Sequence, residues 1–294
     1  MEQWQLKQLK SLPLHVKILK SQQRIKEWYE YYNGEVYVSF SGGKDSTVLL
    51  HLARSVYPDI KAVFCDTGLE FPEIKEFVKS IDNVEIIRPE ISFRNVLDKH
   101  GYPIISKEVA EAVGGARKGQ KSMIEKLTNE ERKFNCTKYK YLLDAPFKIS
   151  AQCCNEMKKK PFKKYEKTTG LKPIVGTMAS ESQQRQKAWL KYGCNAFESK
   201  RPMSKPISFW DEEDIWAYIR QENVEYSDIY NKGYKRTGCI FCMFGVHLEK
   251  YPNRFQNLEY THPQLHDYCI NNLGLKDVLE YLNIEYKDNQ TRMA

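Results

Sequence analysis

The sequence predicts an α/β fold of the Rossmann-like, doubly wound type, in which helices cover both faces of a parallel sheet. Short β-branched and aromatic segments alternate with amphipathic helical segments, which is the order that such a sheet requires. A glycine-containing turn directly follows the first predicted strand, as in nucleotide-binding folds of this class. Helical segments are expected as additions at the N- and C-terminal ends.

The elements of the sheet can be placed in chain order. Apolar residues recur near a 3.6-residue spacing at 12–33, which predicts a helix that ends at Gly34. The following segments predict three strands, at 35–40, 61–65 and 83–88. Helices are predicted between them at 47–55 and 73–81. This order indicates parallel pairing.

The later elements are predicted from weaker patterns. Residues 106–150 are expected to be helical with a mobile loop at 114–121. A buried strand is expected at 174–176, a helix at 211–221 and a loop with two cysteines at 233–245. Short helices are expected beyond about 255, with a polar end at 287–294. The chain is therefore divided into an N-terminal helical segment (1–34), a main domain (35–254) and a C-terminal helical segment (255–294).

Composition narrows the class of protein. The 294 residues are 41% hydrophobic with a mean hydropathy of −0.64, and no apolar run approaches the roughly 18 residues of a membrane helix. The first residues lack the apolar core of a signal peptide, so a cytoplasmic protein without membrane contact is expected. The net charge of +8 favours anionic partners such as nucleotides, nucleic acid or sulfate-like groups, although a solvated lysine-rich surface would also give it.

A candidate phosphate loop (residues 39–46) lies between the first predicted strand and the next helix. It reads Ser39-Phe40-Ser41-Gly42-Gly43-Lys44-Asp45-Ser46. A helix start offers free N–H groups and the positive end of the helix dipole, and glycines let the backbone approach phosphate oxygens. The serines add hydroxyl donors, Lys44 adds charge, and Asp45 could hold Mg²⁺. The pattern differs from the Walker motif.

Eight cysteines suggest chemistry rather than disulfides, because a reducing cytosol disfavours disulfides in a chain of this size. Cys153 and Cys154 are adjacent, and Cys239 and Cys242 form a Cys-x-x-Cys turn. Four thiolates could bind a [4Fe–4S] cluster or Zn²⁺, and the remaining alternative is a set of buried cysteines without metal.

The phosphate loop resembles the PP-loop of the adenine nucleotide alpha-hydrolase superfamily, and the chain is most similar to its phosphoadenosine phosphosulfate (PAPS) reductase family. Residues 66–73 match the family segment Asp-Thr-Gly-x-x-Phe-Pro-Glu, and residues 176–185 resemble Gly-x-Arg-x-x-Glu-Ser-x-x-Arg. The segment that follows is represented by Pro206, Ile207, Trp210, Asp214 and Trp216. Met178 departs from the family, which has Arg there, so one anion contact is expected to be missing.

The resemblance implies a fold of the adenine nucleotide alpha-hydrolase type and cleavage of ATP between its α- and β-phosphates, with Mg²⁺. Lys44, Asp45, Glu181 and Arg185 are then the expected catalytic residues, with Glu70 as a further candidate. The expected nucleotide-binding residues are Ser39, Ser41, Gly42, Gly43, Lys44, Asp45, Ser46, Asp66, Thr67, Gly68 and Gly176.

The iron–sulfur-bearing branch of the family, which is related to adenylyl-sulfate (APS) reductase, holds a [4Fe–4S] cluster with a Cys-Cys pair and a later Cys-x-x-Cys. Cys153, Cys154, Cys239 and Cys242 follow this order, and Lys158 fits a lysine after the pair. The resemblance therefore favours a [4Fe–4S] cluster over zinc. Cys136 is interpreted as an ordinary, partly buried cysteine, with a sulfur carrier as the alternative.

The expected activity follows from a missing feature. Reductases of this family use a C-terminal cysteine flanked by Gly and His to attack the sulfonucleotide, whereas the late Cys269 lacks these neighbours. We therefore expect an ATP pyrophosphatase that adenylates an acceptor for sulfur transfer, with the cluster helping to deliver or position sulfur. One alternative is an APS/PAPS reductase that forms sulfite with Cys269 or Cys136.

A second alternative is a nucleic-acid-binding partner protein with a regulatory nucleotide pocket. The lysine-rich stretch 158–172, interleaved with Phe162 and Tyr165, would suit phosphates and bases, although a solvated helix face would look the same. The expected partners are a nucleotide substrate, a sulfur donor protein (a cysteine desulfurase or thioredoxin) and, as a further candidate, nucleic acid. Because relatives are often dimers or larger, a homo-oligomer is expected.

Overall fold

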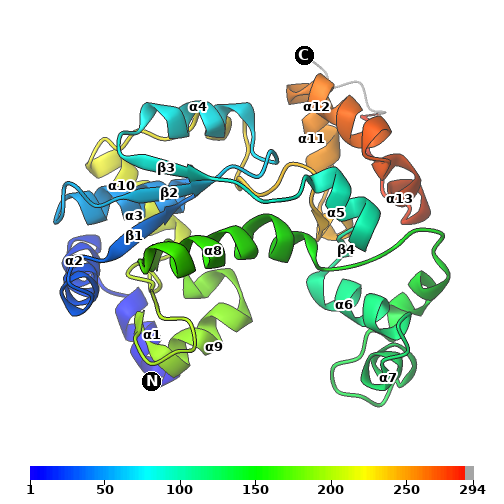
Figure 1. The fold of residues 1–294 in the computed structure, drawn as a ribbon, viewed down its shortest axis with the longest axis horizontal. Coiled ribbons are helices and arrows are strands. Elements are labelled where there is room, and N and C mark those ends of the chain that lie inside the picture. Colours follow the sequence, from blue (N-terminus) through cyan, green and yellow to red (C-terminus); the bar gives the residue numbers. More distant parts are fainter. Residues whose placement is uncertain (289–294) are drawn as a thin grey trace. The chain divides into compact units, whose positions relative to one another are not determined.

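The computed structural model describes residues 1–288, which form two compact units (Figure 1). The first unit comprises Met1–Asp66, Glu70–Arg88 and Lys160–Thr237. The second comprises Thr67–Leu69, Pro89–Lys159 and the chain from Gly238 onward. The three-part division expected from the sequence follows chain order, and it stays a prediction.

A six-stranded sheet forms the centre of the first unit. Its order is β3-β2-β1-β5-β7-β6, and its strands are β1 (Val36–Phe40), β2 (Ala62–Cys65), β3 (Val84–Ile87), β5 (Lys172–Val175), β6 (Asn195–Ala196) and β7 (Met203–Ser204). All neighbours pair in parallel except the edge strand β6, which is antiparallel to β7. In β1, Val38 lies opposite Ala62 on one side and Ile174 on the other. The chain thus leaves β1 toward β2 and returns to its other side as β5, which makes β1 the switch point of the sheet.

The helices of the first unit cover both faces of this sheet. They are α1 (Gln3–Lys10), α2 (Leu14–Tyr31), α3 (Lys44–Arg54), α4 (Pro72–Ser80), α8 (Lys160–Thr169), α9 (Gln183–Tyr192) and α10 (Glu212–Gln221), with short 3-10 turns η3 (Ala179–Glu181) and η4 (Asp228–Tyr230). Phe162 and Tyr165 of α8 pack on Tyr37 of β1, whereas the neighbouring Phe40 meets Phe77 of α4. Because successive strand residues point to opposite faces, α8 and α4 cover different faces of the sheet.

The second unit is mainly helical. Its elements are α5 (Phe93–His100), β4 (Ile104–Ile105), α6 (Lys107–Ala116), α7 (Lys121–Thr128), η1 (Thr137–Asp144), η2 (Asn155–Lys159), β8 (Met243–Phe244), η5 (Val246–Leu248), α11 (Arg254–Thr261), α12 (Pro263–Asp267), η6 (Tyr268–Asn272) and α13 (Leu275–Tyr281). A short parallel pair joins β4 to β8 across a long stretch of chain. η2 and η6 are π-helical.

The predicted doubly wound α/β fold with helical additions at both ends is confirmed, and most element boundaries shift by one to three residues. α3 begins at Lys44 rather than 47, because Ser46 and Thr47 hydroxyls donate to the carbonyl of Gly43 and close the first turn. β5 begins at Lys172 and ends before Gly176 rather than spanning 174–176.

The prediction of a loop at 114–121 is wrong for its first residues, because α6 continues to Ala116. Its glycines serve packing: a Cβ on Gly114 would lie 2.9 Å from the carbonyl oxygen of Ile149, and one on Gly115 would lie 2.7 Å from Met123 of α7. The turn is confined to 117–120. Among residues 1–288, no helix is long and apolar enough to cross a membrane.

Replacing Leu49 tests the packing of α3. Leu49 is fully buried, so Leu49→Ala should lower the free energy of unfolding by about 2–5 kcal/mol through lost burial and a residual cavity. Leu19→Ala in α2 removes the same atoms from an exposed helix position and should change the free energy of unfolding by less than about 0.5 kcal/mol. Urea unfolding followed by circular dichroism measures both, and equal losses would contradict the assigned packing.

Candidate functional site

The phosphate loop lies at the carboxyl end of β1, where open α/β sheets bind their ligands. β1 ends at Phe40 and α3 begins at Lys44, so only three residues connect them. Gly42 has φ of +70°, and a Cβ there would lie 2.8 Å from Ile74 of α4. The turn therefore requires glycine at this position.

Hydroxyl groups close the loop on itself. The N–H of Ser41 donates to Ser46 Oγ at 3.1 Å, and the two serine hydroxyls lie 3.0 Å apart. Ser46 Oγ also donates to the carbonyl of Gly43 at 2.8 Å. The loop is consequently shaped before any ligand binds, with the first turn of α3 directed at the carboxyl edge of the sheet.

Gly176 lets the end of β5 approach the start of α3. A Cβ at this position would lie 2.9 Å from the carbonyl oxygen of Asp45 and 3.1 Å from Cα of Ser46. These neighbours are backbone atoms that cannot turn aside, so a side chain at 176 would push the two segments apart. Gly176 thus helps to fix the position of the phosphate loop.

Lys44 is the central charge of the loop, and it is only 5% exposed. Its Nζ lies 3.4 Å from Asp45 Oδ1 and 3.3 Å from Glu212 Oε1. Burial alone would lower the pKa of Lys44, but Asp45, Tyr230 and Glu212 outweigh it and raise the pKa. Lys44 is therefore a stable cation at neutral pH.

Asp45 has an unusual environment for a carboxylate. Its Oδ1 is buried and receives no well-formed hydrogen bond from the described residues, with only the Lys44 ammonium in ion-pair range. Burial raises the pKa of Asp45, and the negative charges of Glu181 and Glu212 act in the same direction, against Lys44. A cation at this carboxylate would relieve that cost.

Tyr230 and Thr237 join the loop from distant parts of the sequence. The N–H of Lys44 donates to the Tyr230 hydroxyl at 2.7 Å, and this hydroxyl lies 3.3 Å from Thr237 Oγ1. Trp216 packs edge-on against the Tyr230 ring at 5.5 Å. Burial raises the pKa of Tyr230, so its hydroxyl stays protonated.

Sequence reasoning missed Tyr230, Thr237 and Glu212 as members of the site. No local pattern marks them, and the only indirect signal is Trp216, which belongs to the segment that resembles the family and supports Tyr230.

Glu181 and Arg185, which the sequence predicts as catalytic, lie together near the loop. Glu181 accepts a hydrogen bond from the N–H of Met178 at 2.7 Å and forms an ion pair with Arg185. Glu181 is also close enough to raise the pKa of Asp45. Burial lowers the pKa of the nearby Lys205, and the positive charge of Arg185 adds to this effect.

The segment after β2 is held by its own contacts. Asp66 Oδ1 pairs with Lys75 at 3.1 Å, and its Oδ2 accepts from Arg88 Nε at 3.3 Å. Thr67 and Gly68 belong to the second unit, where Thr67 Oγ1 accepts from the N–H of Leu69 and Gly68 has φ of +75°. Asp66 is thus paired with two cations of its own unit, Lys75 and Arg88.

The four cysteines predicted as metal ligands all lie in the second unit. A hydrogen bond with Cys153, helped by Lys107, Lys158 and Lys159, lowers the pKa of the Cys154 thiol to about 6 although burial opposes it. The same hydrogen bond and burial raise the pKa of Cys153, and nearby Cys239 and Cys242 add to the shift. Burial raises the pKa of Cys242, and Cys154 contributes in the same direction.

Cys153 is electrostatically coupled to Cys154, Cys239 and Cys242, so the four thiols share one region of the second unit. Within residues 1–288, however, no group of three or more His, Cys, Asp or Glu side chains is gathered closely enough to hold a metal ion. Four neighbouring thiols, one of them readily ionised, match the donor chemistry of an iron–sulfur cluster. The donor set therefore fits, whereas the closed geometry of a metal site is not formed.

The two thiols considered as reductase nucleophiles are buried. Cys269 lies in η6 with 0% exposure, and burial raises its pKa. Burial also raises the pKa of Cys136. A thiolate nucleophile needs the opposite environment.

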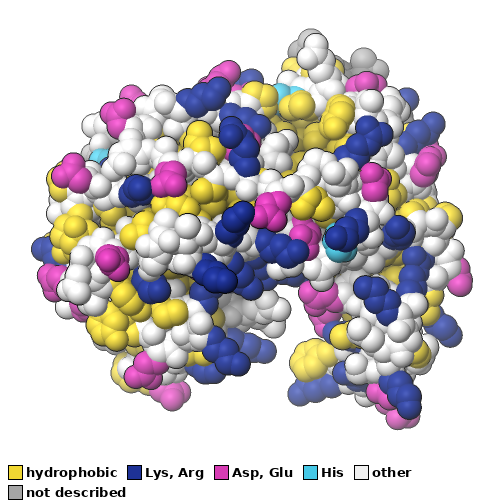
Figure 2. Space-filling view, in the orientation of Figure 1, with side chains coloured by type: hydrophobic (Ala, Val, Ile, Leu, Met, Phe, Trp, Pro, Cys, Tyr) yellow, Lys and Arg dark blue, Asp and Glu magenta, His cyan; other side chains and the backbone are white. Residues whose placement is uncertain are grey.

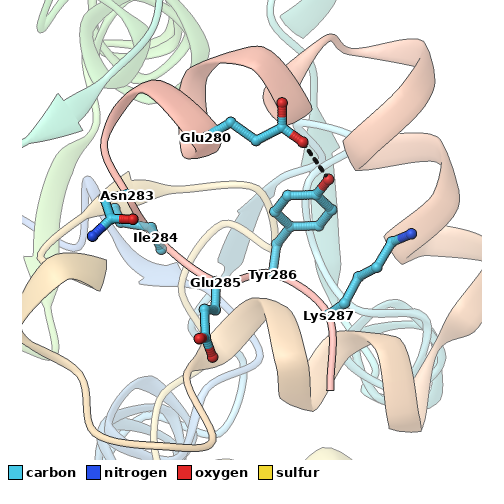
Figure 3. A pocket seen from close by; sticks show the side chains of 6 residues that line it. All are labelled: Glu280, Asn283, Ile284, Glu285, Tyr286 and Lys287. Carbon is cyan, nitrogen blue, oxygen red and sulfur yellow. Dashed lines mark hydrogen bonds between the residues drawn. The ribbon is translucent and has the colours of Figure 1, made fainter. Parts of the chain in front are cut away.

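A separate hollow of about 300 Å³ lies at the end of the described chain. Figure 3 shows the six residues that line it, from the end of α13 and the segment that follows, with the Tyr286 hydroxyl donating to Glu280 at 2.8 Å. None of the predicted site residues lines this hollow.

Comparison with known proteins supports the family that the motifs indicate. Residues 35–244 match the phosphoadenosine phosphosulfate reductase domain family. The chain is 28% identical to the uncharacterized protein MJ0973 of Methanocaldococcus jannaschii, over 84% of this chain and 50% of that protein. It is 25% identical to adenosine 5'-phosphosulfate reductase of Staphylococcus epidermidis, over 76% of each.

A solved structure is similar at a lower level: phosphoadenylyl-sulfate (PAPS) reductase from Candida auris aligns with a TM-score of 0.45 and 18% identity, over 81% of this chain and 96% of that one. The chain spans about half the length of the M. jannaschii relative. The family match covers most of the sequence, and it includes the phosphate loop and the three further motif segments in full. The chain accordingly belongs to the phosphoadenosine phosphosulfate reductase family of the PP-loop superfamily.

Proposed function

We propose that this protein binds ATP at the phosphate loop, splits it between the α- and β-phosphates, and transfers AMP to an acceptor that then receives sulfur. The observation that carries the proposal is the buried Lys44 ammonium at the start of α3, at the switch point of the sheet. A fixed cation and a helix N-terminus together suit a polyphosphate.

Each part of the loop has a task in this reaction. The N–H groups at the start of α3 and the hydroxyls of Ser41 and Ser46 would bind pyrophosphate oxygens, and Lys44 would stabilise the charge that develops on the leaving pyrophosphate. Tyr230 now accepts the hydrogen bond of the Lys44 N–H. A phosphate oxygen that reaches this N–H would replace the tyrosine hydroxyl as acceptor.

The carboxylate of Asp45 fits a magnesium ion. Its buried Oδ1 lacks a well-formed hydrogen bond from the described residues, and hard oxygen donors are what Mg²⁺ prefers. When bound with ATP, Mg²⁺ would neutralise phosphate charge. Asp45 would hold the ion, while Glu181 and Arg185 would organise the α-phosphate side of the site.

The chemical balance of the reaction is simple. An acceptor oxygen attacks the α-phosphorus, the bond between the α-phosphorus and the bridging oxygen breaks, and pyrophosphate leaves. The acceptor then carries AMP, and a sulfur nucleophile displaces AMP to form the carbon–sulfur or phosphorus–sulfur bond. A sulfur donor protein, such as a cysteine desulfurase or thioredoxin, is part of this proposal, as is a homo-oligomeric state.

Cys153, Cys154, Cys239 and Cys242 would hold the proposed [4Fe–4S] cluster. When bound, the cluster would supply a site at which sulfur is positioned for transfer. The low pKa of Cys154 and the lysines near it favour the thiolate that a metal ligand must be.

The similarity to adenosine 5'-phosphosulfate reductases supports a second candidate, a sulfonucleotide reductase. That reaction needs a thiol that reaches the sulfonucleotide, and both Cys269 and Cys136 are buried with raised pKa values. The burial of these thiols is the reason to prefer adenylation.

Lys44→Ala should reduce pyrophosphate release from ATP by at least about 100-fold, because it removes the fixed cation of the loop. Lys79→Ala, at an exposed position of α4, is the matched control and should retain full activity. A coupled pyrophosphate assay with Mg²⁺ measures both variants. Equal rates in Lys44→Ala and Lys79→Ala would contradict the role given to Lys44.

Protein purified without oxygen should be brown, with absorption near roughly 400 nm from a [4Fe–4S] cluster. Cys239→Ala should abolish this absorption and the bound iron, whereas Cys269→Ala, which changes a buried cysteine outside the set, should keep both. Iron and zinc analysis accompanies the spectra. A colourless protein with stoichiometric zinc would overturn the cluster assignment.

A further inference from the structure

Positive charge is concentrated in one stretch of the first unit. Residues 160–210 contain eleven Lys and Arg but only three Glu, an excess equal to the net charge of the whole chain. Two of the three glutamates are already paired, Glu166 with Arg201 and Glu181 with Arg185. Figure 2 shows Lys and Arg side chains gathered over α8 and below it. Lys163 and Lys167 of this stretch are exposed and can meet an anionic partner.

Helix α8 presents part of this charge to solvent. Lys163 and Lys167 are exposed, and neither forms an ion pair in the described part of the chain. The aromatic residues between them face the other way: Tyr165 is 7% exposed, and Phe162 stacks on Tyr37. This packing disfavours the alternative in which Phe162 and Tyr165 contact bases, and α8 offers lysines alone.

Aromatic side chains lie near these lysines at the C-terminal end of α8. Lys172, which follows α8, lies over the ring of Tyr32 at 6.0 Å. The adjacent Tyr31 is 63% exposed and packs against Phe197, with ring centroids 4.4 Å apart. Lys200 is exposed close to Phe197 in the chain. We name Lys163, Lys167, Lys172, Tyr31 and Phe197 the basic–aromatic surface.

The ion pair of Glu166 and Arg201 ties this surface together. Glu166 is part of α8, and its carboxylate accepts from Arg201 Nε at 2.7 Å and from the Tyr37 hydroxyl at 2.8 Å. This ion pair therefore holds the segment that contains Phe197 and Lys200 against α8, which contains Lys163 and Lys167. The lysines and the exposed tyrosine belong to one fixed surface rather than to separate flexible parts.

A hollow of about 210 Å³ opens beside this surface. Trp189, Tyr192 and Phe197 line it together with Lys20 and with Arg24, which is paired with Glu27 of the same lining. Its size suits a single planar ring rather than a drug-sized molecule. Aromatic walls with cations at their edge favour a group that is both flat and attached to an anion.

The direction of α8 relates this surface to the phosphate loop. α8 immediately precedes β5 and packs on the sheet, so it runs against the parallel strands. Its first turn thus lies at the carboxyl edge, where the phosphate loop lies, and its last turn at the opposite edge near Tyr31. The ten residues of α8 span about 15 Å between these two edges.

We propose that the basic–aromatic surface binds a single-stranded nucleic acid, with phosphates along the lysines of α8 and unpaired bases stacked at Tyr31 and in the adjoining hollow. Evenly placed cations beside exposed rings are the combination by which proteins bind single strands. An acidic peptide would use the lysines but would leave the aromatic end without a role. That the nucleic acid is the acceptor of AMP rests on the proposed adenylation. That this surface binds a nucleic acid does not depend on it.

The test is fluorescence anisotropy with labelled, unstructured DNA and RNA strands of about 16 nucleotides, without ATP and at several salt concentrations. The double variant Lys163→Glu/Lys167→Glu should weaken binding at least tenfold and reduce the slope of log K against log salt by about 1.4, or about 0.7 for each lost contact. Lys118→Glu/Lys121→Glu changes the charge equally at exposed lysines of the second unit and should bind like the parent protein.

Tyr31→Ala should weaken binding about tenfold without changing the salt slope, because it removes stacking rather than charge. Thermal unfolding confirms that each variant is folded. The proposal is overturned if the parent protein does not bind either strand at low salt, or if both double variants lose affinity equally. It is also overturned if Tyr31→Ala has no effect and heparin competes as well as the oligonucleotide, since the surface would then bind any polyanion.

A comparison with Lys44→Ala separates this inference from the proposed function. Lys44→Ala should retain the affinity for the strands, because Lys44 is buried away from the surface. Strand binding without pyrophosphate release in the parent protein would leave the inference standing and remove the adenylation reaction. Stronger binding of RNA than of DNA, or the reverse, identifies which of the two is the partner.

Discussion

The ammonium group of Lys44 is held at the start of a helix with almost no solvent around it, and most of the site is arranged around that charge. Asp45 and Glu212 provide the opposite charges, and Tyr230 covers the first N–H of α3. Gly176 allows the end of β5 to press against the same turn. A buried cation is costly unless it is paired, so these contacts must form together. The result is a fixed positive site at β1, where the order of the strands in the sheet reverses.

The two candidate chemistries belong to different units of the chain. The phosphate loop, Glu181 and Arg185 are in the first unit, whereas the four cysteines are in the second. The proposed ATP activation and the proposed metal binding can therefore be tested by separate substitutions, and the two are linked only by the sulfur-transfer proposal.

The sequence predicted the local parts of this structure and missed the long-range ones. The phosphate loop could be recognised because strand, turn and helix are consecutive, and each has its own composition. Tyr230 and Thr237 reach the loop from nearly 200 residues away, and no periodicity records that contact. Gly114 and Gly115 were interpreted as a loop, although tight packing of α6 requires them. The alternative in which Phe162 and Tyr165 contact bases is disfavoured, because Tyr165 is buried and Phe162 is partly buried against the sheet. The sequence of a lysine-rich helix gives little sign of which of its faces is apolar.

The most direct test is the identity of the bond that breaks in ATP. The protein is incubated with Mg²⁺ and ATP labelled at the α-phosphate, with and without a single-stranded oligonucleotide, and the products are separated. The account predicts labelled AMP, free or attached to the acceptor, together with pyrophosphate. Labelled ADP, or no turnover of ATP combined with sulfite formation from adenosine 5'-phosphosulfate in the presence of thioredoxin, would contradict it.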